Sequence, residues 1–308
     1  MRTSQISEPQ VTVLMSVYNG KAHLKPQIES ILRQTYPYIT ILIRDDGSEE
    51  ETRKLLAAFE EQDSRITVIY GSHVGAAASF FRLMRAAGLG DGTYFAFSDQ
   101  DDYWLPEKTE AAVRALSRCD PDIPALYSCR AALTDERLRL LPDRIHNFER
   151  RPGFGNALVE NICFGCTEVF NRPLLELIGG REPDHLVMHD WWLYLVASYT
   201  GTVCFDQEAY ILYRQHGGNS VGAQHTRLGE LTGRLSRLRS QRGSRYEQAR
   251  ELALRYTGPE ERTKLLNLFL DYKMSYKKTL EALFCREIRR QRILDNAALK
   301  LLFLTRYL

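Results

Sequence analysis

Four short apolar runs in the first hundred residues alternate with segments of helical periodicity. The runs cover residues 10–17, 39–44, 66–70 and 94–97. Apolar runs of this length are typical of buried strands, and strands that alternate with helices are typical of a parallel sheet covered on both faces. We therefore predict a Rossmann-like α/β fold with a mostly parallel central sheet flanked by helices.

The regular alternation ends near residue 120, and the pattern turns helical and basic near residue 228. A helix is expected to start near Asp190, and further strands are expected at 125–129, 203–205 and 209–213. The chain is therefore predicted to have two parts, an α/β domain over residues 1–225 and a C-terminal α-helical region over residues 226–308.

The net charge of +2 conceals a strong asymmetry along the chain. Residues 227–308 contain 19 Lys and Arg against 9 Asp and Glu, whereas the remainder is acidic. Basic amphipathic helices are typical of proteins that lie on anionic membranes. Packing of these helices on the body or on a second subunit, which would make a homo-oligomer, is the equal alternative. Nucleic acid is not the expected partner, because the body is acidic.

Composition also predicts the compartment. No window approaches the roughly 18–20 apolar residues of a spanning helix, and the first ten residues lack the apolar core of a signal peptide. The six cysteines are scattered and are expected to be reduced, packed thiols, including the Cys163 and Cys166 pair. A cytoplasmic protein is predicted, with peripheral contact at the inner face of the cell membrane left open.

Acidic side chains follow two of the predicted strands. Asp45 and Asp46 end the second strand, and Asp99, Asp101 and Asp102 follow the fourth. Grouped carboxylates repel one another and usually require a cation, and the carboxyl ends of strands are where open α/β sheets bind ligands. These residues predict a site for a metal ion and a phosphate at one edge of the sheet.

The chain has no glycine loop that would bind phosphates. The turn after the first strand, Val17 to Lys21, matches neither GxGxxG nor GxxxxGK[ST]. A divalent cation held by carboxylates would then neutralise a diphosphate. Asp45 and Asp46 could also form an ordinary strand-to-helix turn, and Ser48 followed by Glu51 matches a capping box for the next helix.

Taken in order, these motifs resemble the N-terminal motifs of the family 2 glycosyltransferases, which have the GT-A fold. The matching segments are Ser16-Val-Tyr-Asn19, Arg44-Asp-Asp-Gly-Ser48, Asp99-Gln-Asp-Asp102, Met188-His-Asp-Trp-Trp192 and Tyr213-Arg-Gln-His-Gly217. The similarity covers most of the chain and is strongest to rhamnosyltransferase-type members that build bacterial surface polysaccharides. It implies that residues 1–225 are a GT-A catalytic domain.

The resemblance implies a set of residues that bind a nucleotide-sugar donor: Ser16, Tyr18, Asn19, Asp45, Asp46, Asp99, Gln100 and Arg214. Tyr18 would pack on the base, Asp46 with Asp45 would accept hydrogen bonds from it, and Asp99 would face the ribose. Asp101 would ligate Mg²⁺ or Mn²⁺ between the phosphates, with His216 as a further ligand. Asp102 receives no role.

Asp190 would be the catalytic base that deprotonates the acceptor hydroxyl, and direct in-line attack would invert the sugar. His189, Trp191 and Trp192 would bind the acceptor. Two adjacent indoles are not expected to point inward together on one helix, so one of them is expected to face the acceptor. The structural alternative is that Asp190 only caps a helix.

The resemblance thus implies a metal-dependent, inverting transfer of a sugar, L-rhamnose from dTDP-L-rhamnose, to a saccharide or lipid-linked acceptor. A UDP-hexose donor is an alternative. A Mg-dependent nucleotidyltransferase would also need clustered carboxylates, but would require a basic, glycine-rich triphosphate loop. A membrane-surface scaffold without activity is the third alternative. Tyr213-Arg-Gln-His216 replaces the QxxRW motif of processive synthases, which favours transfer of one or a few residues.

Overall fold

The computed structural model describes residues 8–142, 151–215 and 243–308. The chain divides into two compact units, which are described separately. Unit 1 comprises Met1–Ala132, Gly165–Arg181 and Asp206–Tyr213, and unit 2 comprises Leu133–Phe164, Glu182–Phe205 and Arg214–Leu308. The predicted boundary between residues 225 and 226 lies outside the described residues.

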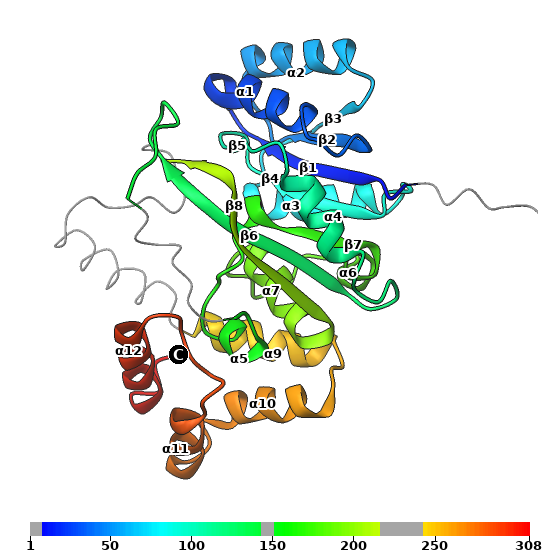
Figure 1. Ribbon diagram of the computed structural model, residues 1–308. Helices are drawn as coiled ribbons and strands as arrows, with labels where there is room; N and C mark the ends of the chain where they lie inside the picture. The colour runs from blue at the N-terminus through cyan, green and yellow to red at the C-terminus, as the bar shows by residue number, and fades with distance from the viewer. Residues whose placement is uncertain (1–7, 143–150, 216–242) are drawn as a thin grey trace, which may run out of the picture. The chain divides into compact units, whose positions relative to one another are not determined.

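An eight-stranded sheet with the order β3-β2-β1-β4-β7-β6-β8-β5, most of whose residues belong to unit 1, forms the core of the α/β part (Figure 1). Its strands are β1 Val11–Val17, β2 Ile39–Asp45, β3 Ile66–Tyr70, β4 Tyr94–Ser98, β5 Tyr103–Trp104, β6 Ala125–Thr134, β7 Val169–Asn171 and β8 Thr202–Arg214. The first four apolar runs form the parallel part, since β1 pairs in parallel with β2 and β4, and β2 with β3. Strand β7 joins them antiparallel to β4. The predicted sheet is confirmed.

The helices between the strands pack on this sheet through their apolar faces. They are α1 Lys21–Leu32, α2 Glu50–Gln62, α3 Ala76–Ala87, α4 Lys108–Leu116 and α6 Arg172–Ile178, with a 3₁₀ helix, η1, at Gly165–Thr167. All five residues of β4 are buried, and Phe97 contacts Phe80 of α3 with a ring-centroid distance of 4.9 Å. The buried central strands hold their carboxyl ends, which carry the acidic motifs, in a fixed position.

Unit 2 is helical. Its helices are α5 Phe154–Ala157, α7 His189–Thr200, α9 Ser244–Arg255, α10 Glu260–Asp271, α11 Tyr276–Phe284 and α12 Ile293–Leu304. Helix α9 is fixed to the segment before α7 by Glu251, whose carboxylate accepts hydrogen bonds from the backbone N–H groups of Asp184 and His185 at 2.7 and 2.6 Å. Within the described residues, no helix is both long enough and apolar enough to span a bilayer.

Candidate functional site

The motif residues of unit 1 lie at one edge of the sheet because their strands run parallel. The register pairs Val17 of β1 with Asp45 of β2, and Met15 of β1 with Ser98 of β4. The residues that follow each strand therefore leave the sheet side by side. This is the edge at which open α/β sheets bind ligands, as the sequence predicted.

Gln100 bridges the turns after β1 and β4. Its side-chain oxygen accepts the Tyr18 N–H at 2.9 Å, and its side-chain nitrogen donates to the Tyr18 carbonyl at 3.1 Å. A Cβ atom at Gly20 would lie only 2.2 Å from the Gln100 side-chain oxygen. A larger residue at position 20 would displace the Gln100 amide, a predicted donor contact that holds the Tyr18 backbone.

Asn19 joins the same turn to the start of α2. Its backbone is left-handed, with φ of 51°, a conformation that asparagine tolerates better than most residues. Its N–H donates to the Ser48 hydroxyl at 3.0 Å, and its side-chain oxygen accepts the Glu49 N–H at 2.8 Å. The predicted capping box is wrong: Glu49 occupies the N-cap position, and the Ser48 hydroxyl bonds Asn19.

The Asp46 carboxylate is buried and bonded by protein groups. It accepts hydrogen bonds from Arg44 and from the backbone N–H groups of Val74 and Gly75, both at 2.9 Å. The Nδ1 atom of His73 lies 3.0 Å from its second oxygen. These contacts fix the loop after β3 against the end of β2.

Asp45 is equally enclosed. One of its oxygens accepts the Ser48 N–H at 3.0 Å, and the other accepts the Arg53 Nε–H at 2.9 Å. Its side chain is fully buried, whereas that of Arg53 is 45% exposed. Contact between a nucleotide base and the two carboxylates stays a prediction. Such a contact would have to compete with the hydrogen bonds that the protein already makes to both carboxylates.

Tyr18 and His73 form an exposed aromatic pair at the edge. Their ring centroids lie 4.2 Å apart with an interplanar angle of 30°, and Tyr18 is 45% exposed. No binding role was predicted for His73, although it follows β3, which ends at the same edge as β1 and β2. Flat, half-exposed rings beside polar groups are suited to stacking with a base.

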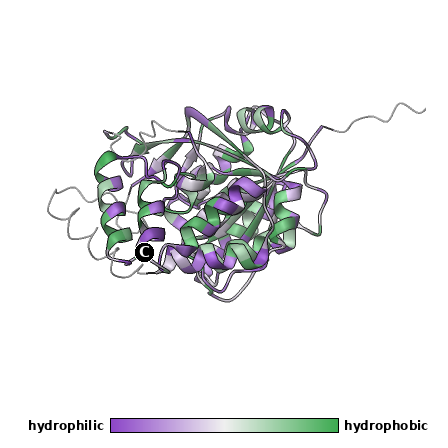
Figure 2. Ribbon diagram, turned by 90° about the horizontal axis from the view of Figure 1, so that it is seen from below, coloured by the Kyte–Doolittle hydropathy of each residue, from purple (hydrophilic) through white to green (hydrophobic). Residues whose placement is uncertain are grey.

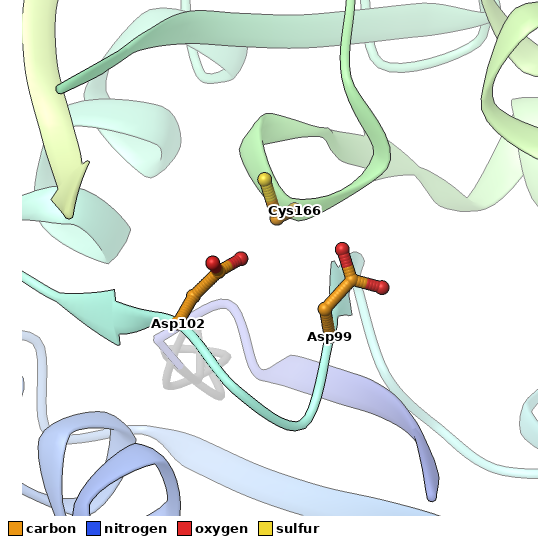
Figure 3. A group of neighbouring side chains, drawn as sticks. All are labelled: Asp99, Asp102 and Cys166. Carbon is orange, nitrogen blue, oxygen red and sulfur yellow. The ribbon is translucent and has the colours of Figure 1, made fainter. Parts of the chain in front are cut away.

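The acidic run after β4 divides into two environments. Asp102 is fully buried, whereas Asp99 and Asp101 are half-buried. Possible ligand atoms of Asp99, Asp102 and Cys166 all lie within 4.8 Å of one another, and Figure 3 shows the three side chains together. Asp101, the predicted metal ligand, does not belong to this group of three among the described residues.

The chemistry of this group suits a hard cation only through its carboxylates. Burial, followed by the charges of Asp102 and Asp99, raises the pKa of the Cys166 thiol well above its ordinary value. A thiol that keeps its proton is a poor metal ligand. Oxygen atoms are the ligands that Mg²⁺ and Mn²⁺ prefer, so Asp99 and its neighbours in the run fit such an ion.

Lys108 is a buried basic residue near Asp102, and the sequence alone did not reveal its burial. It is fully buried, and its Nζ lies 3.5 Å from the centroid of the Trp104 ring. Burial lowers the pKa of Lys108 to about 8, while the nearby Cys129, Cys166 and Asp102 act in the opposite direction. Asp102 is thus the buried end of the acidic run, and its charge acts on the pKa of a lysine that is itself fully buried.

In unit 2, the predicted base Asp190 lies in the first turn of α7. It is 7% exposed, and its carboxylate accepts the Trp191 N–H at 2.7 Å. Met188 occupies the N-cap position, so Asp190 is not the capping residue of the structural alternative. A carboxylate in the first turn is nevertheless favoured by the helix dipole.

Both tryptophans of the motif are buried, so the expectation that one must face outward is wrong. Trp191 is 6% exposed and donates its indole N–H to the Ala157 carbonyl at 2.6 Å; Trp192 is fully buried and contacts Tyr256. The prediction fails because α7 is buried on every side from His189 to Tyr199. Burial also lowers the pKa of the His189 imidazole. Acceptor binding by these three residues stays a prediction.

Arg214 ends β8, is 4% exposed and donates to the carbonyl oxygen of Glu136. Ser16, also a predicted donor-binding residue, donates its hydroxyl to the Ser79 hydroxyl at 2.6 Å. His216, the second predicted metal ligand, lies outside the described residues.

Comparison with solved structures identifies the class of fold. Residues 1–349 of Staphylococcus aureus TarS in complex with UDP-GlcNAc match with a TM-score of 0.59 at 14% identity, over 90% of this chain and 77% of that one. The mannosyltransferase PcManGT from Pyrobaculum calidifontis, in complex with GDP-Man and Mn²⁺, matches with a TM-score of 0.57 at 16% identity, over 98% and 84%. The protein has a GT-A-like glycosyltransferase fold.

Sequence comparison supplies the family. Residues 12–179, more than half of the chain, match the family model for glycosyl transferase family 2, and the chain belongs to this family. The dTDP-rhamnosyl transferase RfbG of Shigella flexneri is 30% identical over 68% of this chain and 74% of its own. An uncharacterized glycosyltransferase of Rickettsia prowazekii is 26% identical over 73% and 70%. The predicted family and enzyme class are confirmed, and the nucleotidyltransferase alternative is not supported.

Proposed function

We propose that this glycosyltransferase binds a nucleoside diphosphate sugar at the edge of unit 1 and transfers the sugar with inversion. The observation that carries the proposal is the exposed Tyr18–His73 pair beside the acidic run, at an edge held in place by buried strands. The base would stack on Tyr18, and Asp99 would face the ribose. Ser16, Asn19 and Gln100 would serve chiefly to hold the turn in which Tyr18 lies.

We further propose that Mg²⁺ or Mn²⁺ binds the carboxylates of the acidic run, with Asp101 as a ligand and His216 as a further one. The half-buried Asp99 and Asp101 are the carboxylates of the run that solvent can reach. When bound, the ion would neutralise the charge of the leaving diphosphate. The structure of PcManGT with GDP-Man and Mn²⁺ supports a metal in this fold class.

Asp190 is proposed to hold the proton that the acceptor hydroxyl loses. A carboxylate in a water-poor position is suited to general-base work, and such groups contribute roughly 10²–10⁴-fold to a rate. Arg214 is proposed to act near the diphosphate, and His189, Trp191 and Trp192 to shape the acceptor side. Attack by the activated hydroxyl on the anomeric carbon, with departure of the diphosphate, inverts the sugar.

The proposed donor is dTDP-L-rhamnose, and the proposed acceptor is a saccharide or a lipid-linked saccharide of a bacterial surface polysaccharide. The name of the Shigella flexneri relative supports the donor. The putative teichuronic acid biosynthesis glycosyltransferase TuaG of Bacillus subtilis, 35% identical over 33% of this chain, supports polysaccharide or cell-wall synthesis. Cytoplasmic action at the inner face of the membrane is part of the same proposal. A UDP-hexose is the alternative donor.

A panel of nucleotide sugars tests the proposal. Each donor is measured for thermal stabilisation of the full chain with Mn²⁺ and with EDTA, because a ligand that binds the folded state raises the unfolding temperature. The expected result is stabilisation by dTDP-L-rhamnose that requires the metal and exceeds that by UDP-glucose or UDP-GlcNAc. A larger stabilisation by a UDP-hexose would show that the proposed donor is wrong. Equal stabilisation with Mn²⁺ and with EDTA would show that donor binding does not require the metal.

A further inference from the structure

Helix α12 carries apolar side chains on two opposite sides. Its inner side holds Leu299 and Phe303, which are buried. The Phe303 ring packs edge-on against Phe269 of α10 and Tyr272, with centroid distances of 6.1 and 5.1 Å. This inner side is sufficient to fix α12 in unit 2.

The outer side of α12 is also apolar. Ile293, Leu294, Leu301 and Leu304 are 78%, 80%, 61% and 53% exposed. Figure 2 shows the helix next to the C-terminus coloured hydrophobic over most of its length. A surface helix is ordinarily polar on its outer side, and contiguous exposed apolar patches mark interaction sites.

Helix α11 continues the same surface. Tyr276, Leu280 and Phe284 follow one another at intervals of four residues and are 79%, 47% and 70% exposed. The Arg306 guanidinium lies 4.9 Å from the Tyr276 ring centroid, and Lys300 Nζ lies 5.9 Å from that of Phe284. Lys300 of α12 and Arg306, which follows α12, thus lie near the two ends of the row of exposed side chains on α11. We call the two stripes together the terminal face: Tyr276, Leu280, Phe284, Leu294, Leu301 and Leu304.

The terminal face is surrounded by positive charge. Residues 273–308 contain nine Lys and Arg against three Asp and Glu. Lys277, Arg286, Arg289, Arg292 and Lys300 are all exposed. Exposed aromatic and aliphatic side chains with a basic border are the composition of helices that lie in the interface of an anionic bilayer.

We propose that the terminal face docks on the surface of a bilayer that contains anionic phospholipids, with its apolar side chains among the acyl chains and its basic residues at the headgroups. Charge decides between this partner and a second copy of the chain. In a two-fold symmetric dimer the terminal face of one copy would contact the terminal face of the other, and the positive charges of the two copies would repel one another. The terminal face contains none of the residues proposed to bind the donor, so membrane binding and sugar transfer can be tested separately.

Cosedimentation of the full chain with lipid vesicles tests this proposal. The vesicles contain phosphatidylcholine alone or phosphatidylcholine with phosphatidylglycerol. Binding should be at least about tenfold tighter to the anionic vesicles and should weaken with added salt. The double variant Leu294→Asp with Leu301→Asp should lose about tenfold or more in affinity. The matched control is Leu89→Asp in unit 1, since Leu89 is 90% exposed and lies outside the terminal face.

Circular dichroism and thermal stabilisation by nucleotide will check that each variant is folded. The double variant is expected to fold, because Leu294 and Leu301 are both exposed. Equal sedimentation of the wild type, the double variant and the Leu89 variant would overturn the proposal, as would failure of the wild type to bind anionic vesicles. So would a dimer in sedimentation equilibrium that the double variant dissociates, because the terminal face would then be an interface between copies.

Discussion

The motif residues of unit 1 and those of unit 2 lie in opposite surroundings. In unit 1, Tyr18 and His73 are half-exposed at a sheet edge, and their positions are fixed by hydrogen bonds beneath them. In unit 2, the residues from His189 to Trp192 are all buried within a helix that is itself buried. Residues of a sequence motif can therefore lie on an exposed edge, as in unit 1, or inside a helix of the core, as in unit 2.

This difference predicts different consequences for substitutions in the two units. A substitution at the edge of unit 1 should weaken ligand binding with little loss of stability. Substitutions in α7 should divide into those that remove a reactive group and those that destabilise the fold.

The largest expected effect is on turnover, from Asp190→Asn. The substitution keeps the shape of the side chain but removes the proton acceptor, so the transfer rate should fall by about 10²–10⁴-fold. Steady-state transfer assays measure this, and unfolding in urea checks that stability is kept. The control is Asp184→Asn, an exposed acid of the same unit. Transfer at the wild-type rate would remove Asp190 from the role of base.

The next largest effect is on stability, from Trp192→Ala. This indole is fully buried, and truncation of such a side chain leaves a cavity that costs about 3–5 kcal/mol in the free energy of unfolding. Urea unfolding followed by circular dichroism measures the loss. If stability changed by less than about 1 kcal/mol, α7 would not be a core helix, and the contrast between the units would disappear.

Tyr18→Ala should instead weaken donor binding about fivefold, since stacking contributes about 1 kcal/mol, and should leave the unfolding temperature of the free protein nearly unchanged. The concentration of dTDP that gives half-maximal thermal stabilisation measures the change. Tyr38→Ala is the matched control, because Tyr38 is 48% exposed against 45% for Tyr18 and precedes β2 rather than following a strand. Equal effects of the two variants would argue against stacking on Tyr18.

A further effect concerns pH and the buried Lys108. The pKa of Lys108 is lowered from 10.5 to about 8 by burial. Between these values the unfolded chain holds more protons than the folded chain, so this lysine makes stability rise with pH. Below pH 8 its destabilising contribution is fully present.

Relative to Lys108→Met, the wild type should therefore gain stability from pH 7 to pH 10, as measured by urea unfolding at both values. Burial raises the pKa of the Cys129 thiol to about 11, so this thiol makes stability fall with pH and opposes the contribution of Lys108. Lys54→Met on the surface of α2 is the control. A stability difference between wild type and variant that does not change with pH would contradict the assignment.

The sequence was sufficient for the sheet and for the edge at which the site lies. Apolar runs report strands directly, and parallel strands necessarily bring the segments after β1, β2 and β4 together. It was not sufficient for the state of each carboxylate. Asp46 is bonded by the N–H groups of Val74 and Gly75, which lie more than 25 residues away. Such contacts depend on how a loop returns to the sheet, which periodicity does not record.

The failures of the sequence arguments have the same origin. The Ser48 hydroxyl accepts a hydrogen bond from Asn19 instead of capping α2. Asp102 lies near Cys166 and Lys108, which are distant from it in the sequence or carry no motif. The outward indole was inferred from helical geometry on the assumption that α7 has a solvent side, but all residues of this helix from His189 to Tyr199 are buried. His73 was interpreted as a structural or solvated residue, because a single histidine after a strand forms no motif.

The proposed division of roles assigns donor binding to the acidic run of unit 1 and removal of the acceptor proton to Asp190 of unit 2. Isothermal titration calorimetry of dTDP with Mn²⁺ into Asp101→Asn and Asp190→Asn tests it most directly. The expected result is about tenfold or greater loss of affinity in Asp101→Asn, because a metal ligand is lost, and wild-type affinity in Asp190→Asn. Wild-type affinity in Asp101→Asn together with weakened binding in Asp190→Asn would contradict the account.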